Sequence, residues 1–471
     1  MWFLVPLAFW MLATALHLKV GDFYQLSVDP EYPLLYNGIV VGTGSFAINF
    51  IDHPATPLIF IIGTAARLFH LFTAELSYLQ DFLNDPEKYI TAANILNNLF
   101  IAFALTYAGI KVKKYSGSIL LALVIQLSIF SHHSLIGISS RLIPESTMMI
   151  PLILISALTI KYIYNSNQQR IKPYLWQFPL LIAFGVGCKL SFGPMLLFPF
   201  ILLNTTARQK INLLGYSILF CCIFAYPILT NFEASYQWFS SMATHSGQHG
   251  SGEMNIINWI ALPTNFNELL AMDPWFFVLM VINFILLLIN SLSLDSKPSD
   301  QSIRISRAQK ATLITLTLIA LFTLKHFALH YFMPFLVFRG LLILLIVLFL
   351  KELIFVVKSV NILRPLVRSS LIITLLFVVN SAAMIAKTSD NFQKNNKAAD
   401  EHQLYILEQM DDKNAALIVD APYWGSPFET YAHAFGFMKA HKRKTYFKIA
   451  LKEKFPRFYW FVGWTDEFNH W

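Results

Sequence analysis

Long apolar runs recur from one end of the chain to the other, and they constrain its fold more than any other feature. The chain has 471 residues, of which 56% are hydrophobic and 13% are charged. A soluble domain carries about 25% charged residues. Several runs approach the length of about 20 residues that crosses a bilayer. The sequence therefore predicts an all-α polytopic membrane protein.

We expect about 11 transmembrane helices. The expected spans are residues 1–18, 90–110, 117–132, 146–163, 174–188, 190–204, 211–230, 274–292, 310–325, 331–350 and 369–386. The junction between 174–188 and 190–204 is compatible with a tight turn between two spans or with a break in one helix. The apolar N-terminal stretch lacks a basic flank and a clear small-residue cleavage site, which favours a retained span over a signal peptide.

Basic residues predict the orientation, because cytoplasmic loops are enriched in Lys and Arg. With the spans above, five basic connections fall on one face of the membrane, which we take as cytoplasmic. Their residues are Lys111, Lys113, Lys114, Lys161, Arg170, Lys172, Arg208, Lys210, Lys297, Arg304, Arg307, Lys310, Lys351, Lys358, Arg364 and Arg368. The external face then holds the loops 19–89, 133–145 and 231–273, the short turn 326–330 and the tail after 386.

The apolar segment 57–73 cannot be another span without inverting every later loop. We therefore expect a helix that lies in the outer interface, with Arg67, His70 and Glu75 towards water.

The chain divides by composition into a membrane domain, 1–386, and a polar tail, 387–471. In the tail, 415–420 is typical of a short buried strand, and 428–440 of a helix. We expect a small α/β extracytoplasmic domain there. The lysines of the tail do not oppose this orientation, because long exported domains do not follow the charge rule.

Other features exclude partners rather than identify them. The three cysteines, Cys188, Cys221 and Cys222, lie in apolar segments and do not form a metal or disulfide pattern. The net charge is +8, but no basic patch is interleaved with exposed aromatic residues, so a nucleic-acid partner is not expected.

Two acidic clusters follow the first span. The first contains Asp29 and Glu31, and the second contains Asp52 followed by His53. They are either solvated loop charges or groups placed just outside the bilayer to act on a lipid-borne substrate. Ionisable residues at a membrane are costly, which makes them functional candidates.

Arg141 and Glu145 flank the expected outer start of a span. Pro144 suits the first turn of a helix, and Glu145 would stabilise its positive end. The alternative is that Arg141 and Glu145 face a cavity and hold a polar substrate.

Cationic side chains occur at the outer ends of two other spans. Lys189 is surrounded by apolar and small residues, and Lys325 and His330 precede a late span. Lys189 either extends alone to the interface or is buried and directed at a lipid phosphate. Two such sites on one face would suit a phosphate head group, for which Lys supplies a point charge.

The polar loop 245–253 contains His245, His249 and Glu253 among three glycines. A metal site is one interpretation, but the glycines oppose a helix that would align these ligands. A flexible lid that binds substrate is the more natural one.

Together these motifs resemble the GT-C superfamily, membrane glycosyltransferases that take a sugar from a polyprenyl-phosphate carrier on the outer face. Protein O-mannosyltransferases and the aminoarabinose transferases of lipid A are of this kind. The resemblance covers about 1–205 and 325–340. It implies that Asp29 is the general base and that Glu145 is the second acidic residue. Lys189 would lie near the lipid phosphate, and His330-Tyr331 would stand where the family has Arg-Tyr. Glu145 lacks a partner acid, which leaves a divalent metal open.

The expected function is an inverting transfer from a polyprenyl-phosphate sugar to a glycan, lipid or protein acceptor. Glu31, Asp52, His53, Arg141, Glu145, His245 and His249 would bind substrate, and Lys189, Lys325 and His330 would bind the lipid phosphate. No protein-bound cofactor is required. We expect a bacterial plasma membrane, with the site facing the periplasm or exterior. A transporter or lipid flippase is the alternative, although no internal repeat supports it.

Overall fold

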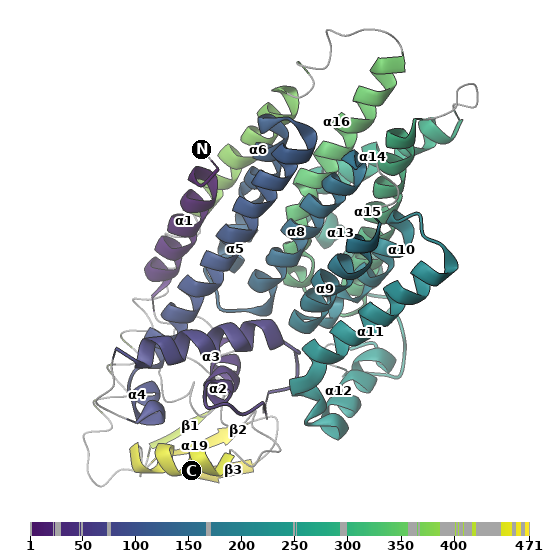
Figure 1. Ribbon diagram of the computed structural model, residues 1–471. Helices are drawn as coiled ribbons and strands as arrows, with labels where there is room; N and C mark the ends of the chain where they lie inside the picture. Colours follow the sequence, from purple (N-terminus) through teal and green to yellow (C-terminus); the bar gives the residue numbers. More distant parts are fainter. Residues whose placement is uncertain are drawn as a thin grey trace.

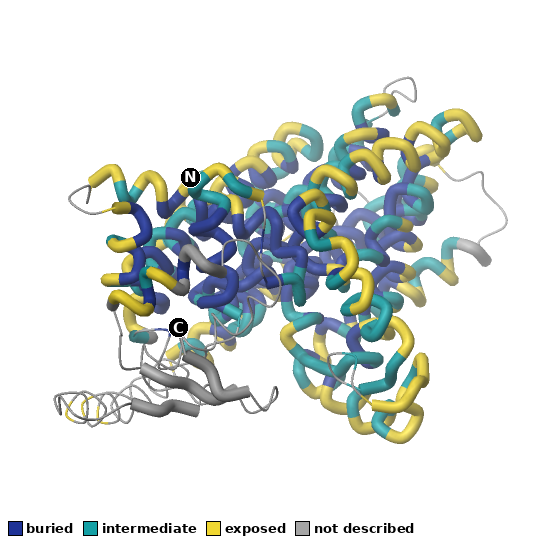
Figure 2. Tube along the Cα trace, turned by 90° about the horizontal axis from the view of Figure 1, so that it is seen from below, coloured by how far each residue is buried: buried dark blue, intermediate teal, exposed yellow. Residues whose placement is uncertain are grey.

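The computed structural model is a bundle of helices with a small sheet at one end (Figure 1). It describes residues 2–21, 23, 30–46, 48, 50–72, 77–165, 171–247, 250, 252–292, 299–356, 365, 368–386, 401, 404, 408, 417–420, 444–454, 458–462 and 467–470. Buried positions form the middle of the bundle, and exposed positions its periphery (Figure 2). The chain is a helical membrane protein by the length and apolarity of its helices.

Six helices in the described part of the chain are long and apolar enough to cross a membrane, or eight if two bent pairs each count as one span. The bundle contains α1 (Leu4–Val20), α5 (Pro86–Ser116), α6 (Ile119–Leu127), α8 (Pro144–Tyr164), α9 (Lys172–Cys188), α11 (Ala207–Leu229), α14 (Pro274–Leu292), α15 (Asp300–Lys325), α16 (Arg339–Val356) and a last helix over 368–386. Ten of the predicted spans overlap one of these elements each, and 190–204 overlaps a shorter apolar stretch, Leu190–Leu202. Because α1 and α9 are also shorter than a full crossing, the count of about 11 spans stays a prediction.

Three helices of the first predicted loop gather at one end of the bundle. They are α2 (Glu31–Gly42), α3 (Thr56–His70) and α4 (Tyr78–Asn84). Figure 1 shows α3 lying across the ends of α1 and α5 rather than along them, as expected for the segment 57–73. Arg67 is exposed and lies over the ring of Tyr78, and His70 pairs with Asp81. Glu75 lies outside the described residues.

Glycines allow α2 and α3 to pack at backbone distance. A Cβ atom at Gly63 would lie 2.9 Å from the carbonyl oxygen of Gly38, and one at Gly38 would overlap the side chain of Ile62. Such contacts are closer than real Cβ atoms permit. This close packing fixes the relative positions of Glu31, at the start of α2, and the segment before α3.

The junction at Lys189 is a reversal between two passes of the chain. The backbone of Lys189 is extended, and a 3-10 stretch, η4 (Leu190–Leu197), leads from it into α10 (Phe198–Leu202). The ring of Phe192 folds back onto Gly185, where no Cβ could fit. A 3-10 helix rises about 2.0 Å per residue against about 1.5 Å for an α-helix. The short segment therefore returns across the bundle with few residues.

Two other helices are broken. α6 continues through η2 (Ser128–Phe130) into α7 (His133–Ser139) with a bend of 67°, and α13 (Leu262–Met272) meets α14 at 93°. A buried ion pair between Arg339 and Asp273 joins these breaks, since Arg339 also donates to the carbonyl of Ser131. Asp273 in turn accepts from the backbone N–H of Phe276 at the start of α14.

The predicted basic face is present as one end of the bundle. Lys161 lies over the rings of Tyr115 and Tyr174, Lys351 lies 6.0 Å from the ring centre of Tyr164, and Arg304 donates to the carbonyl of Asn165. The connections after α5 and α8, the start of α15 and the end of α16 therefore meet at the same end. That this end is cytoplasmic stays a prediction.

The described part of the tail contacts the other end. β1 (Leu417–Asp420) pairs in parallel with β2 (Phe458–Val462), which pairs antiparallel with β3 (Glu467–His470). The strand predicted at 415–420 is thus present, whereas the helix predicted at 428–440 lies outside the described residues. In α19 (Lys444–Lys454), Phe447 is buried against Tyr36 of α2 and Phe82 of α4. Whether the tail is an independent domain stays a prediction.

Candidate functional site

A polar cavity of about 470 Å³ opens at the end of the bundle that carries α2 and α3. It is formed by the start of α2, the segment before α3, the α7–α8 junction, the reversal at Lys189 and the segment that leads into η6 (Leu329–Tyr331) and η7 (Met333–Phe338). Its lining includes Pro30, His53, Arg141, Glu145, Lys189, His326, His330 and Tyr331. The structure thus brings five of the predicted site residues to one wall, although up to 277 positions separate them in the chain.

The centre of this cavity is an ion pair between Lys189 and Glu145. The two side chains are only 6% and 3% exposed. Pro144 begins α8 and Glu145 lies in its first turn, as expected for a helix start. Lys189 Nζ also lies 3.8 Å from the ring centre of Tyr331, so an anion and an aromatic face hold the ammonium group together. Lys189 is therefore buried and directed into the cavity, not extended alone to the interface.

Two histidines flank the pair. His330 Nε2 lies 3.7 Å from Glu145 Oε1, and its side chain is half exposed. His53 also lines the cavity and is half buried, and it forms a hydrogen bond with the backbone of Asp52, the residue before it. Burial lowers the pKa of His53 to about 3, and the positive charge of Lys189 acts in the same direction. His53 is therefore neutral at physiological pH and adds a dipole rather than a charge to the cavity.

Glu31 and Arg141 form the second ion pair. Arg141 Nε donates to Glu31 Oε1 at 2.6 Å, and one of its terminal nitrogens donates to Glu31 Oε2 at 2.9 Å. Glu31 is fully buried, and Arg141 reaches the cavity wall. A two-point pair of this kind fixes orientation as well as charge. It ties the start of α2 to the segment before α8.

The predicted base, Asp29, lies outside the described residues. The next residue, Pro30, lines the cavity, and Glu31 is bound to Arg141 there. Asp52 is half buried beside His53 and does not line the cavity.

The end of α12 (Phe232–Thr244) and the start of the loop that follows it contact His326, which lines the cavity. The two ring nitrogens of His326 contact the carbonyls of Met242, at 2.6 Å, and Gly247, at 2.9 Å. Lys325 binds the carbonyl of Ala243, and is not part of the cavity lining. His245 is half buried outside the lining, and His249 lies outside the described residues. The loop predicted as a lid is thus joined to the cavity by His326.

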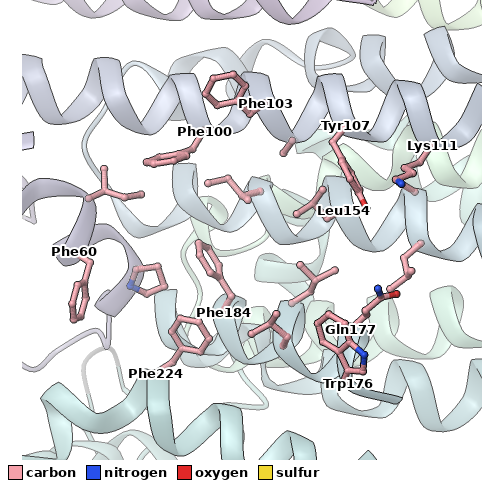
Figure 3. Close-up of a pocket in the computed structure, with 18 of the residues that line it drawn as sticks. Phe60, Phe100, Phe103, Tyr107, Lys111, Leu154, Trp176, Gln177, Phe184 and Phe224 are labelled. Atoms are coloured by element: carbon pink, nitrogen blue, oxygen red, sulfur yellow. The ribbon is translucent and has the colours of Figure 1, made fainter. Parts of the chain in front are cut away.

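An apolar groove of about 690 Å³ begins next to the polar cavity (Figure 3). Thr56 and Pro57 line the groove, whereas His53, three residues earlier, lines the cavity. Figure 3 shows Phe60 near one end and Lys111 near the other, with aromatic rings from Phe100, Phe103, Phe184 and Phe224 between them. From Phe100 to Lys111 along α5 the groove extends about 16 Å, at about 1.5 Å per residue.

Within the described ranges, no group of three His, Cys, Asp or Glu side chains is arranged to hold a metal ion. The interpretation of His245, His249 and Glu253 as a metal site stays untested, because His249 lies outside those ranges.

Sequence reasoning missed Tyr331 as the aromatic partner of Lys189, and it missed the buried pair of Asp273 with Arg339. The signal for Asp273 was present, since an Asp directly before Pro and an apolar run is typical of a helix start. Nothing in the chain order indicated that Tyr331 would reach Lys189.

Comparison of the chain with family models, with curated proteins and with solved structures gives no match.

Proposed function

We propose that the protein is an inverting glycosyltransferase that moves a sugar from a polyprenyl-phosphate carrier to a hydroxyl group at the outer face of a membrane. The observation that carries the proposal is the Glu145–Lys189 pair at the wall of a polar cavity, beside an apolar groove. A carrier of this kind has a phosphate that needs a cation and a chain that needs an apolar surface. The cavity and the groove adjoin through residues 53–57. The cavity supplies a cation, and the groove supplies an apolar surface.

Lys189 is the proposed phosphate ligand. Glu145 and Tyr331 fix its ammonium group at the cavity wall, so that little reorganisation is needed when an anion arrives. His330 lies on the same wall and would share the charge of the phosphate. The long chain of the carrier would lie among the aromatic rings of the groove, between Pro57 and Lys111.

Asp29 is the proposed general base. In the reaction, the acceptor oxygen forms a bond to the anomeric carbon while the bond from that carbon to the phosphate oxygen breaks. The proton of the acceptor hydroxyl passes to Asp29, and the polyprenyl phosphate leaves as an anion next to Lys189. A single displacement inverts the anomeric configuration. General-base assistance contributes about 10²–10⁴-fold to such a rate.

The test is transfer by the purified protein in nanodiscs, given a panel of polyprenyl-phosphate sugars and simple alcohols as acceptors. We expect Asp29→Asn to lower the released polyprenyl phosphate by about 10²–10⁴-fold while the thermal unfolding of the protein is unchanged. Asp22→Asn, in the same loop, is the matched control and should keep full activity. Near-normal transfer by Asp29→Asn would exclude it as the base.

Lys189 has a separate test, because its role is in binding. Lys189→Arg keeps a positive charge but changes its shape, and we expect it to weaken binding of the donor more than it slows turnover. Unchanged donor affinity would remove the assigned role.

A lipid transporter or flippase is the second candidate, and the groove is the observation that favours it. The groove extends from the cavity towards the end of the bundle that carries Lys111 and Lys161. Movement of a fluorescent polyprenyl phosphate between the leaflets of vesicles, without loss of sugar, would support this function over the transferase.

The proposed orientation has its own test. Reporter fusions at Lys113 and at Asp85 should report opposite sides of the membrane, because α5 lies between them. Reporters on the same side would contradict the proposed topology.

A further inference from the structure

The structure contains a second polar cavity at the opposite end of the bundle, of about 440 Å³. It lies where the end of α8, the start of α9, the start of α11 and the start of α15 meet. Its lining is Tyr162, Asn165, Ile171, Tyr174, Asn204, Thr205, Thr206, Gln209, Asp300, Ile303, Arg304 and Arg307. No residue of this cavity takes part in the proposed transfer.

The charge of this cavity favours an anion. Arg304 and Arg307 supply two guanidinium groups against the single carboxylate of Asp300. Arg304 donates to the carbonyl of Asn165, but its Nε is buried and has no hydrogen-bond partner within the described part of the chain. The hydroxyl oxygen of Thr205 is likewise buried and has no hydrogen-bond partner among the described residues. Buried donors of this kind are costly unless a ligand or water meets them.

The start of α11 adds a favourable dipole. Thr206 and Gln209 line the cavity and form a capping box, in which the side chain of each accepts from the backbone N–H of the other. The positive end of the helix dipole favours a negative group beside it. Phosphate groups commonly bind where such a helix start lies beside arginine.

The surface next to the cavity favours a lipid as the molecule that would carry such a phosphate. From its start, α11 presents an outward apolar face, with Ile211 at 70%, Leu214 at 51% and Ile218 at 56% exposure. An acyl chain attached to a phosphate in the cavity could follow this face along the helix. Tyr162 and Tyr174 at the cavity wall are residues typical of the interface between a membrane and water.

We propose that this cavity binds the phosphate of an anionic membrane lipid, in the leaflet opposite to the Glu145 cavity. The proposal is independent of the proposed transfer reaction. Basic cavities between transmembrane helices are suited to lipid head groups, and here two arginines and one helix start converge on the same space.

The experiment measures lipid binding to the full chain in nanodiscs of phosphatidylcholine that contain increasing fractions of phosphatidylglycerol. The readouts are the thermal unfolding midpoint and the number of lipids retained in native mass spectrometry. We expect phosphatidylglycerol to raise the midpoint, and the double variant Arg304→Gln/Arg307→Gln to bind it at least about tenfold more weakly. Inorganic phosphate added to pure phosphatidylcholine discs tests the free anion, and an equal effect from it would overturn the assignment to a lipid.

The matched control is Arg208→Gln/Lys210→Gln, which removes the same charge from exposed positions of α11 outside the cavity. An equal loss of binding in the control would overturn the proposal, because a diffuse surface charge would then explain it. If the arginine variant does not fold, Thr205→Glu keeps both arginines and places a carboxylate in the cavity. It should abolish the lipid effect, and full binding by Thr205→Glu would also overturn the proposal.

Discussion

Cationic side chains have different partners at the two ends of the bundle. At the end with α2 and α3, cations are paired with carboxylates, as in Lys189 with Glu145 and Arg141 with Glu31. At the opposite end, lysines rest on aromatic rings, as Lys161 does on Tyr115 and Tyr174. The first end is balanced in charge and preorganised, whereas the second keeps its positive charge. Among the described residues, the first end therefore holds buried ion pairs, and fixed charges of this kind favour a preorganised site.

The two ends also differ in the backbone conformation at their charged residues. Lys189 and Tyr331 lie where helices give way to extended or 3-10 segments, and His53 lies in a loop. Lys161 and Arg304 instead lie within regular helices. At the first end, breaks in helices bring side chains from several segments into one cavity. The comparison predicts how strongly each region responds to substitution.

The largest effect should follow Lys189→Met. The substitution leaves Glu145 buried without its cation, which costs about 3–5 kcal/mol of the free energy of unfolding. Chemical unfolding in detergent micelles measures it. Adding Glu145→Gln should restore much of the stability but no transfer activity. A loss below about 1 kcal/mol for Lys189→Met would contradict the description of a buried, mutually dependent pair.

Gly63→Ala should have the next largest effect. The added methyl group would meet the backbone of Gly38 and Gly42 and push α2 away from α3. Overpacking of this kind costs about 1–3 kcal/mol. The same unfolding measurement applies, with Gly137→Ala as control, because a Cβ there has no neighbour within 4 Å. Equal effects at the two positions would show that the α2–α3 contact is not tight.

His53→Gln should change the pH dependence of stability. The pKa of His53 is about 3 in the folded protein, against about 6.5 when unfolded. Below pH 6.5 the unfolded chain binds a proton that the folded chain does not, so stability falls as pH falls towards 3. The slope from one such group is at most about 1.4 kcal/mol per pH unit. Unfolding between pH 7 and pH 5 should therefore be less pH-dependent in the variant, and an unchanged slope would mean that His53 is solvated.

The smallest effect should come from Lys161→Met. Among the described residues, its ammonium group contacts the rings of Tyr115 and Tyr174 and has no carboxylate partner, and such ring contacts contribute about 0.5–1 kcal/mol. We expect a change within about 1 kcal/mol in the assay used for Lys189→Met. A loss as large as that of Lys189→Met would remove the distinction between the two ends.

The sequence predicted what depends on composition and periodicity. The helical bundle, the strand near 415–420 and the transverse helix at 57–73 follow from local patterns, and so does the gathering of basic residues at one end. Which side chains meet could not be predicted in this way. Glu145 contacts Lys189 across 44 positions and Glu31 contacts Arg141 across 110, and only packing determines such partners. The junction at Lys189 also stayed open, because its reversal depends on Phe192 fitting over Gly185.

The packing of Phe447 against the adjacent rings of Tyr36 and Phe82 has a consequence for biosynthesis. The ribosome makes α2 and α4 long before it makes α19, because 365 positions separate Phe82 from Phe447. The helices around Glu31 consequently wait for this packing partner until α19 has been made and has reached their end of the bundle. A chain cut short before α19 would keep the contact between Tyr36 and Phe82 but would lack the ring of Phe447 that packs on both.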